Sequence, residues 1–234
     1  MDFEGRCVMV SGASGNLGRA LARVLAARGA RLVLLGSRAE SLARAFGSGD
    51  ERRLLVPADL LDARQVEAAA AAAIGRYGRI DVLCNLAGGF GMGPAVHETP
   101  PADWDHLMNL NVRTLLHTAH AVVPRMLAAG GGRIVNVGAY AARAGAAGMG
   151  AYAASKAAVL RLTESMSAEL RERGINVNCV LPTIIDTPEN RAAMPTADPA
   201  RWVAPADLAE VIAFLASDAA RAVHGAALPV TGLS

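Results

Sequence analysis

The feature that most constrains the fold is a regular alternation between short apolar runs and longer segments of helical length. Seven short runs are rich in Val, Leu and Ile and are interpreted as strands: CVMV, RLVLL, LLVPA, IDVLCN, GRIVNV, INVNCVL and ALPV. Six segments between them are long enough for helices: 17–28, 37–46, 63–77, 112–129, 152–173 and 205–217. Strands that are apolar along nearly their whole length are typical of a parallel sheet covered on both faces. The alternation therefore predicts an α/β fold with a doubly wound, seven-stranded parallel sheet and helices on both faces.

The length and the charge of the chain narrow the class of protein. The chain has 234 residues and no linker, repeat or low-complexity segment, so we expect residues 1–234 to form one domain. The formal net charge is +2 and the charged residues are scattered, so we expect no nucleic-acid partner. The apolar stretches are interrupted well short of the roughly 20 residues that a membrane span needs, so we expect no membrane association.

The amino-terminal residues and the cysteines indicate where the protein works. Residues 1–5 are polar and lead directly into an apolar strand, so no signal peptide is expected. Cys7, Cys84 and Cys179 are odd in number and far apart, which favours buried free thiols in a reducing cytoplasm. No cluster of Cys and His has the spacing of metal ligands, so we expect no metal site.

The first apolar run is followed by a glycine-rich motif, SGASGNLG at residues 11–18, which also opens the first helical segment. Gly12 permits a tight turn, Gly15 lets the backbone approach a pyrophosphate, and Gly18 allows close packing of helix on sheet. The N–H groups and the positive dipole end of the helix favour phosphate charge. The motif predicts a dinucleotide site, and a plain turn is the alternative that a glycine-rich loop alone leaves open.

The end of the second apolar run bears on the choice between NAD and NADP. A carboxylate that binds the ribose is expected there for NAD, but the sequence has Ser37 and Arg38. A guanidinium pairs with a 2′-phosphate, which a carboxylate would repel. The two residues therefore favour NADP, with NAD as the second possibility. The alternative for Arg38 is an exposed first-turn residue without a ligand.

A third motif, Tyr152-x-x-x-Lys156, lies in a strongly helical segment. The spacing of four places both side chains on one helix face, about one turn apart. A free tyrosine has a pKa of about 10 and is a poor acid–base catalyst near neutral pH. A neighbouring ammonium group is expected to lower that pKa by favouring the phenolate. The pair is therefore a candidate for proton transfer.

Together these motifs resemble the short-chain dehydrogenase/reductase family over essentially the whole chain. The matching pieces are SGASGNLG, Asp59 in PADL, NLAG at 85–88, Asn111 in NLNV, IVNV, YAASK, and LPTIIDT at 181–187. The resemblance implies a Rossmann-like fold and an NAD(P)-dependent oxidoreductase. It also implies three catalytic positions. Tyr152 would donate and accept the proton, Lys156 would hold the nicotinamide ribose and lower the pKa of the Tyr, and Asn111 would anchor a water-linked proton relay to Lys156.

The motifs and the resemblance together imply a set of cofactor-binding residues. Ordered along the dinucleotide, the set is Gly12, Ser14, Gly15, Asn16, Leu17 and Gly18 for the pyrophosphate; Ser37 and Arg38 for the ribose phosphate; Asp59 and Leu60 for the adenine; Asn85, Ala87 and Gly88 for the central ribose; and Tyr152, Lys156, Pro182, Ile185 and Thr187 for the nicotinamide end.

Three positions depart from the usual pattern of the family. Ala139 stands thirteen residues before Tyr152, where a catalytic Ser is usual, so one hydrogen-bond donor to a substrate carbonyl is missing. Losing such a donor costs about 100- to 1000-fold in rate where the chemistry depends on it. Asn16 replaces the middle Gly of the glycine-rich loop, and Thr183 replaces the usual Gly after the sixth apolar run.

A narrower resemblance, to the dihydropteridine reductases, accounts for the missing Ser. It is carried by DVLCNLAGGFGMGPA, VGAYAARAGAAGMGAY and IIDTPENRAAMPTAD-x-x-x-W. That family lacks the same Ser and reduces a quinonoid, imine-like system, for which protonation by Tyr152 would suffice. It usually prefers NADH, however, whereas Ser37 and Arg38 favour NADPH, so a pterin substrate is not assigned.

The expected function is NAD(P)H-dependent reduction of a small conjugated carbonyl, quinonoid or imine-like acceptor. Three alternatives stay open: an ordinary carbonyl or 3-oxoacyl reductase, a dihydropteridine reductase proper, and a non-catalytic cofactor-binding sensor. The polar segment 184–200 is long enough for a lid. Segments 112–129 and 152–173 carry apolar residues on more than one face, and the corresponding helices of the family pair across a twofold axis. A homodimer or homotetramer is therefore expected.

Overall fold

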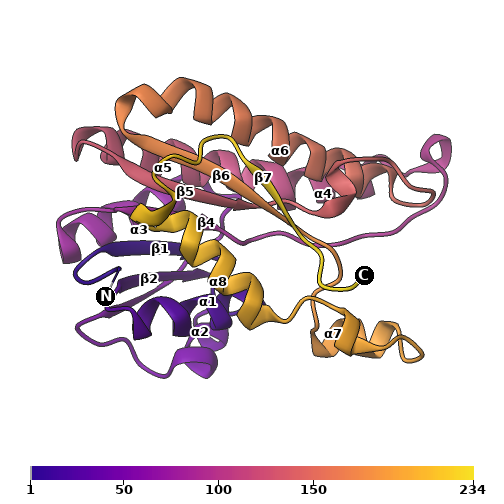
Figure 1. The fold of residues 1–234 in the computed structure, drawn as a ribbon, viewed down its shortest axis with the longest axis horizontal. Coiled ribbons are helices and arrows are strands. Elements are labelled where there is room, and N and C mark those ends of the chain that lie inside the picture. Colours follow the sequence, from indigo (N-terminus) through magenta and orange to yellow (C-terminus); the bar gives the residue numbers. More distant parts are fainter. Residues whose placement is uncertain (1) are drawn as a thin grey trace.

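The computed structural model describes residues 2–234 and contains a seven-stranded parallel sheet (Figure 1). Its strands are β1 (Cys7–Ser11), β2 (Arg31–Gly36), β3 (Arg53–Pro57), β4 (Val82–Asn85), β5 (Gly132–Val137), β6 (Ile175–Pro182) and β7 (Ala227–Val230). Their order across the sheet is β3-β2-β1-β4-β5-β6-β7, and each neighbouring pair is parallel. The seven predicted strands and the doubly wound α/β class are therefore confirmed. Met1, part of the polar start of the chain, lies outside the described residues.

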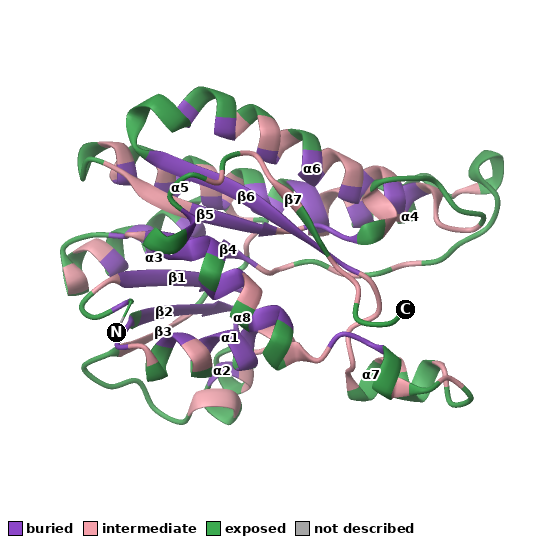
Figure 2. Ribbon diagram, in the orientation of Figure 1, coloured by how far each residue is buried: buried purple, intermediate pink, exposed green. Residues whose placement is uncertain are grey.

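Helices cover both faces of the sheet, which leaves the central strands buried, whereas the edge strands β3 and β7 and the outer helix faces are partly or fully exposed (Figure 2). The helices are α1 (Asn16–Ala27), α2 (Ala39–Phe46), α3 (Ala63–Tyr77), α4 (Pro101–Met108), α5 (Thr114–Ala128), α6 (Gly150–Leu170), α7 (Pro188–Ala193) and α8 (Pro205–Ala216). Apolar residues of α1, α2 and α8 pack on one face of the sheet, and those of α3 and α5 pack on the other, together with the end of α6. Apolar packing on both faces explains why the strands are apolar along nearly their whole length.

The helix boundaries follow local capping signals. Asp62 accepts a hydrogen bond from the N–H of Arg64 and begins α3, and Gly78 ends it in the left-handed conformation with φ of 79°. An acidic N-cap and a glycine after the last turn are the usual signals for such boundaries. The predicted segment 63–77 is accordingly confirmed without change.

Two helices were not predicted, because each is short and shows little apolar periodicity. Pro101 occupies the first turn of α4. In α7, Pro188 occupies the first turn and the Thr187 hydroxyl accepts from the N–H of Asn190. Proline in the first turn and a Thr N-cap are start signals for a helix. The segment 184–200, interpreted from the sequence as long enough for a lid, therefore contains α7.

The helical segment predicted at 112–129 begins earlier than expected. A π-helical segment, Asn109–Arg113, joins α4 to α5, so the chain is helical from Pro101 to Ala128. Such π-helical turns are frequent at functional sites. Asn111, a predicted catalytic residue, lies at the centre of this one.

The three cysteines are buried and unpaired, as predicted. Burial raises the pKa of Cys7 and of Cys84 to about 12 and that of Cys179 to about 11. Thiols with such pKa values carry almost no thiolate at neutral pH, so these cysteines are structural rather than reactive. Among the helices that residues 2–234 form, none is both long and apolar enough to cross a membrane.

Candidate active site

The order of the strands places the expected site at the carboxyl edge of the sheet, where β1 and β4 lie side by side. Ser11 at the end of β1 is in register with Asn85 at the end of β4. The chain passes from β1 outward to β2 and β3 and then returns to β4, so this position is the switch point of the sheet. Ligands of doubly wound sheets bind at this point. The Ser11 hydroxyl accepts from the N–H groups of Leu86 and Ala87, at 3.1 and 3.2 Å, and so holds the two loops together.

The glycine-rich loop has the shape that the motif predicted. Gly12 has a φ of +65°, and a Cβ atom there would lie 2.9 Å from the nitrogen of Ala87. A Cβ atom on Gly18 would lie 2.5 Å from the carbonyl oxygen of Ala13. Both positions therefore require Gly. The first turn of α1, which begins at Asn16, leaves N–H groups without intrahelical partners, and a pyrophosphate fits such a cradle.

Arg38 and Ser14 lie at the end of β2. Arg38 is the exposed N-cap residue of α2 and forms no salt bridge with any residue of the described chain, 2–234. The Ser14 hydroxyl lies 3.4 Å from the position that a Cβ atom on Gly36, the last residue of β2, would occupy. This corner of the site therefore carries an unneutralised guanidinium and a hydroxyl, which suits a phosphate group.

The residues expected at the adenine lie between β3 and α3. The Asp59 carboxylate accepts from the N–H of Leu61 at 2.9 Å, which shapes the turn. The carbonyl oxygen of Leu60 lies 2.8 Å from Nδ1 of His117 on α5. No sequence motif identified this contact, because residues 60 and 117 are distant in the chain.

The side chain of Asn85 does not line the candidate cofactor site. Its amide donates to Asn136 at 2.9 Å, and its carbonyl oxygen accepts from Thr118 at 2.7 Å. Asn136 in turn donates to Thr163 at 2.9 Å, so β4 and β5 are tied to helices α5 and α6. Buried polar groups of this kind fix neighbouring elements when every member is paired. The contact of Asn85 with the central ribose, which the resemblance implied, would therefore be made by its main-chain atoms.

Tyr152 and Lys156 both lie on α6, as predicted, but their ionisation differs from the prediction. Burial raises the pKa of Tyr152 to about 12, and burial lowers the pKa of Lys156 from 10.5 to about 8. The Lys156 amine donates to the carbonyl oxygen of Val137 at 3.0 Å. The predicted lowering of the pKa of Tyr152 by Lys156 is therefore wrong, because the pKa of this phenol is set by its removal from water, which raises it.

Asn111 connects the π-helical segment to both α6 and the loop after β4. Its carbonyl oxygen accepts from the N–H of Gly89 at 2.9 Å, and its amide donates to the carbonyl oxygen of Gly89 and to the Ser155 hydroxyl. A Cβ atom on Gly88 would lie 2.7 Å from the Asn111 side chain and 3.1 Å from the Lys156 amine. The side chains of Asn111 and Lys156 therefore both lie close to Gly88, and the water-linked relay that the resemblance implied stays a prediction.

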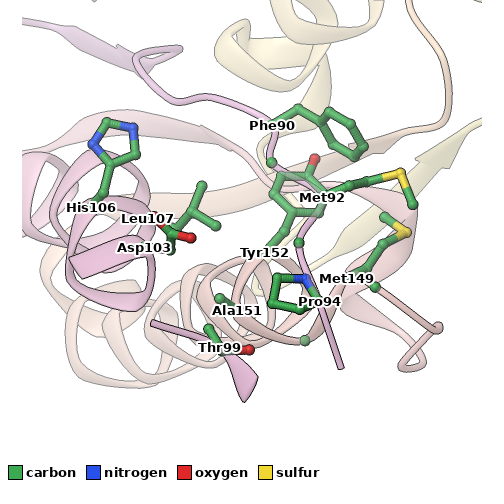
Figure 3. Close-up of a pocket in the computed structure, with 14 residues that line it drawn as sticks. Phe90, Met92, Pro94, Thr99, Asp103, His106, Leu107, Met149, Ala151 and Tyr152 are labelled. Carbon is green, nitrogen blue, oxygen red and sulfur yellow. The ribbon is translucent and has the colours of Figure 1, made fainter. Parts of the chain in front are cut away.

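A cavity of about 190 Å³ lies beside Tyr152 (Figure 3). Its apolar lining includes Phe90, Met92, Leu107 and Met149. The Phe90 ring meets the Tyr152 ring edge to face at 5.0 Å, although the Phe90 side chain is 63% exposed. Pockets for drug-sized molecules measure about 300–1,000 Å³. The cavity therefore suits a small acceptor, or one part of a larger one.

Ala139 is buried at the end of β5 and has an extended backbone, with φ of −160°. Its methyl group offers no hydrogen-bond donor. At the neighbouring strand end, Pro182 closes β6, Ile185 pairs with Val203, and Thr187 caps α7. These three residues, expected at the nicotinamide end, share the carboxyl edge with Tyr152.

The residues that sequence reasoning missed are polar or aromatic side chains that lie within the quoted motifs but were given no role there, notably Ser11, Phe90, Ser155 and Glu189. Each acts through a contact with a residue distant in the chain or in another turn, which local patterns do not reveal. Within residues 2–234, no group of three or more His, Cys, Asp or Glu side chains is arranged to hold a metal ion.

A glycine-rich loop at the switch point of a parallel sheet, together with a half-buried Tyr152 and a buried Lys156 on one helix, defines a dinucleotide-dependent oxidoreductase. The short chain dehydrogenase family model matches residues 6–198. The chain belongs to the short-chain dehydrogenase/reductase family and is an NAD(P)-dependent oxidoreductase.

Named relatives and solved structures agree with this membership. The chain is 35% identical to D-threitol dehydrogenase of Mycolicibacterium smegmatis, covering 98% of this chain and 93% of that protein. It is 34% identical to a 3-oxoacyl-[acyl-carrier-protein] reductase of Vibrio cholerae, covering 99% and 98%. A gluconate 5-dehydrogenase from Burkholderia cenocepacia, solved in complex with NADP and tartrate, matches with a TM-score of 0.89 and 33% identity over 98% of this chain and 95% of that one. The narrower resemblance to the dihydropteridine reductases is not tested by these relatives and stays a prediction.

Proposed function

We propose that the protein reduces a small conjugated carbonyl, quinonoid or imine-like acceptor with NADPH. The observation that carries the proposal is the position of Tyr152 at a cavity lined in part by apolar side chains, in a chain that has a buried alanine, Ala139, at the usual position of the catalytic Ser. The site can supply a proton, but Ala139 provides no second donor for a carbonyl oxygen. An acceptor that is electron-poor through conjugation needs only the proton, and the exposed Phe90 ring gives a planar acceptor an aromatic surface.

The chain's own groups account for the proton and the charge. When bound, the reduced nicotinamide supplies the hydride. Tyr152 donates the hydroxyl proton to the nitrogen or oxygen of the acceptor, and the phenolate left behind is stabilised by the Lys156 ammonium group. Asn111 holds the Gly89 loop and the start of α5 against α6. We assign to Asn111 the relay through which Tyr152 regains its hydroxyl proton. The remaining residues of the expected cofactor set hold the dinucleotide along the carboxyl edge.

NADPH is the proposed cofactor because Arg38 carries a guanidinium that no carboxylate of residues 2–234 neutralises. Wild-type protein should bind NADPH at least tenfold more tightly than NADH, and Arg38→Ala should remove this preference, since one charge-assisted contact contributes about 1.4 kcal/mol. Titration calorimetry with both dinucleotides measures the ratio. Arg44→Ala, in the last turn of the same helix, is the matched control and should keep the preference. Equal affinities of the wild type for NADPH and NADH would contradict the assignment.

The second candidate is an ordinary carbonyl or 3-oxoacyl reductase, which the Vibrio cholerae relative favours by its name. The two candidates are separated by a screen of NADPH oxidation with quinonoid dihydropterin, quinones, cyclic imines and 3-oxoacyl thioesters. Turnover of conjugated acceptors at least tenfold above that of 3-oxoacyl thioesters supports the proposal, and the reverse order supports the second candidate.

We also propose that the protein works as a homodimer or homotetramer, through the exposed faces of α5 and α6.

The substitution Ala139→Ser tests the same distinction within the site. If the site is built for a conjugated acceptor, the new hydroxyl should leave the turnover of that acceptor unchanged or slower, because it adds bulk and a dipole without a charge to stabilise. If the protein is a carbonyl reductase that lost its donor, turnover of simple ketones should rise, by up to about 100- to 1000-fold. Steady-state rates measured with a conjugated acceptor and with simple ketones distinguish these two cases. Ala141→Ser is the control for an added hydroxyl nearby. A large gain with ketones would overturn the proposal.

A further inference from the structure

Two of the three positions that depart from the family pattern, Asn16 and Thr183, adjoin the same part of the structure: Asn16 contacts it, and Thr183 directly precedes it in the chain. That part is the cover segment, defined as residues 184–203, which includes α7 and ends in the pairing of Ile185 with Val203. In Figure 1 the cover segment carries α7 away from the sheet, next to the carboxyl terminus. It also carries Thr187, one of the residues proposed for the nicotinamide end.

Asn16 contacts the outer part of the cover segment. The Asn16 amide donates to the Glu189 carboxylate at 2.8 Å, and the Arg19 guanidinium donates to the Asn16 carbonyl oxygen at 2.6 Å. Arg19 therefore orients the amide so that its N–H faces Glu189, which lies in the first turn of α7. The usual Gly at position 16 has no side chain and could not link the glycine-rich loop to α7.

Thr183 directly precedes the cover segment and contacts the carboxyl-terminal residues. Its hydroxyl donates to the carbonyl oxygen of Thr231 at 2.9 Å and lies 2.9 Å from the Ser234 hydroxyl. The same terminal residues also hold the other end of the cover segment, because Arg201 donates to the carbonyl oxygen of Leu233 at 2.7 Å and accepts from its N–H at 2.9 Å. A Gly at position 183 has no hydroxyl and could not form the contacts with Thr231 and Ser234.

The internal contacts of the cover segment fix its shape but do not attach it to the glycine-rich loop. Asp186 donates from its N–H to Val203 at 2.8 Å, and Asn190 donates to the carbonyl oxygen of Ile185 at 2.8 Å. Arg191 forms a two-bond salt bridge with Asp186, at 2.6 and 2.7 Å. All of these partners lie within the segment, so its position relative to the glycine-rich loop depends on contacts with other parts of the protein.

We propose that Asn16 and Thr183 are positioning residues that hold the cover segment in place over the nicotinamide end of the site. Asn16 fastens α7 to the glycine-rich loop through Glu189, and Thr183 fastens the base to the carboxyl-terminal residues. The position of the acceptor beneath the cover segment rests on the proposed function. The attachment of the cover segment to the glycine-rich loop and to the carboxyl-terminal residues does not. Two of the three departures from the family pattern thereby share one physical role.

Hydrogen–deuterium exchange of peptides within residues 187–201 tests the attachment without any substrate. Glu189→Ala, which leaves the glycine-rich loop unaltered, and Thr183→Val, which keeps the size of the side chain, should each raise the exchange rate of these peptides by about three- to tenfold, as expected for one lost hydrogen bond. Asn16→Ala should match Glu189→Ala, and the double variant of these two should exchange no faster than either single variant. Asn16→Ala combined with Thr183→Val should show the product of the two effects, because the contacts are separate.

The controls keep the hydrogen-bonding groups. Glu189→Gln retains an oxygen that accepts from Asn16, and Thr183→Ser retains the hydroxyl, so both should exchange as the wild type does. Unchanged exchange in both Glu189→Ala and Thr183→Val, or an equal increase across the strands of the sheet, would overturn the proposal. With an acceptor from the screen, the KM of Glu189→Ala and of Thr183→Val should rise three- to tenfold, while their kcat should change less than twofold. A failed screen would count against the proposed function alone, since the exchange measurement needs no turnover.

Discussion

Replacing Tyr152 by Phe is expected to lower the rate of acceptor reduction by about 10²- to 10⁴-fold, the usual contribution of a positioned general acid. Burial raises the pKa of Tyr152 to about 12, so the hydroxyl keeps its proton across the neutral range. The substitution removes only the oxygen, and the ring should keep its edge-to-face contact with Phe90. The loss should therefore appear in kcat, measured by stopped-flow oxidation of NADPH, with cofactor affinity changed less than threefold.

Tyr140 provides the matched control for this experiment. It lies in the short helical turn after β5, close in sequence to Ala139, and its ring is half-exposed against Arg143. Tyr140→Phe removes a hydroxyl from the same region and should leave the rate within about twofold of the wild type. A Tyr152→Phe variant with near-normal turnover would mean that water or the acceptor itself supplies the proton, and the assignment of Tyr152 as the acid would be wrong.

Replacing Lys156 by Met is expected to stabilise the protein and to abolish its activity. Lys156 is the only lysine in the chain, beside many arginines, and burial lowers its pKa from 10.5 to about 8. A shift of that size corresponds to about 3 kcal/mol of destabilisation at pH 7, where the buried amine is charged. Met is similar in length and carries no charge, so Lys156→Met should raise the melting temperature by roughly 6–12 °C at pH 7. Reduction should fall at least 100-fold, because the phenolate would lose its counter-charge.

The pH dependence of this effect has a definite sign. The folded-state pKa of Lys156 lies below the unfolded value, so the unfolded chain binds more protons between pH 8 and pH 10.5. The free energy of unfolding contributed by Lys156 therefore rises with pH through that window. The stability difference between Lys156→Met and the wild type should be largest below pH 8 and should shrink toward pH 10.5. Calorimetric melting at pH 7 and pH 10 measures this difference, with the exposed Arg161→Met as control.

The same pKa sets the pH profile of the reaction. Lys156 carries its charge below about pH 8, so reduction should decline as the pH rises through that value, while Tyr152 stays protonated. A single lysine gives a single side-chain signal in a lysine-labelled NMR spectrum, so the pKa can be measured directly. A measured pKa near 10.5, or a stability difference that is equal at pH 7 and pH 10, would contradict this account of Lys156.

Much of the fold was predictable from the sequence because its signals are local. Each of the seven apolar runs forms a strand, and segment 63–77 forms the predicted helix α3. The two helices that were missed, α4 and α7, have eight and six residues and depend on proline and Thr start signals rather than on apolar periodicity. Short helices of this kind gain their stability from tertiary packing, which a local pattern does not report.

The candidate site divides in the same way between local and tertiary causes. The glycine spacing in residues 11–18 determined by itself that a tight turn would lead into a helix, because the steric limits of Gly12 and Gly18 act over a few residues. The spacing of Tyr152 and Lys156 likewise determined that both would lie on one helix. Their protonation was decided only by the tertiary structure, since it depends on burial by elements distant in the chain.

Contacts between distant residues were decided by the tertiary structure alone. The side chain of Asn85 follows a strand like a ligand-binding residue, yet Asn136 and Thr118 hold it inside the protein. Asn16 and Thr183 looked like losses of Gly until the fold brought Glu189 and Thr231 to them. The sequence by itself determined the class, the strands and the positions of the chemical groups, because these follow from local sterics and from apolar periodicity. The partners and charges of those groups were decided by the packing, because hydrogen bonding and removal from water depend on what the folded chain places around each side chain.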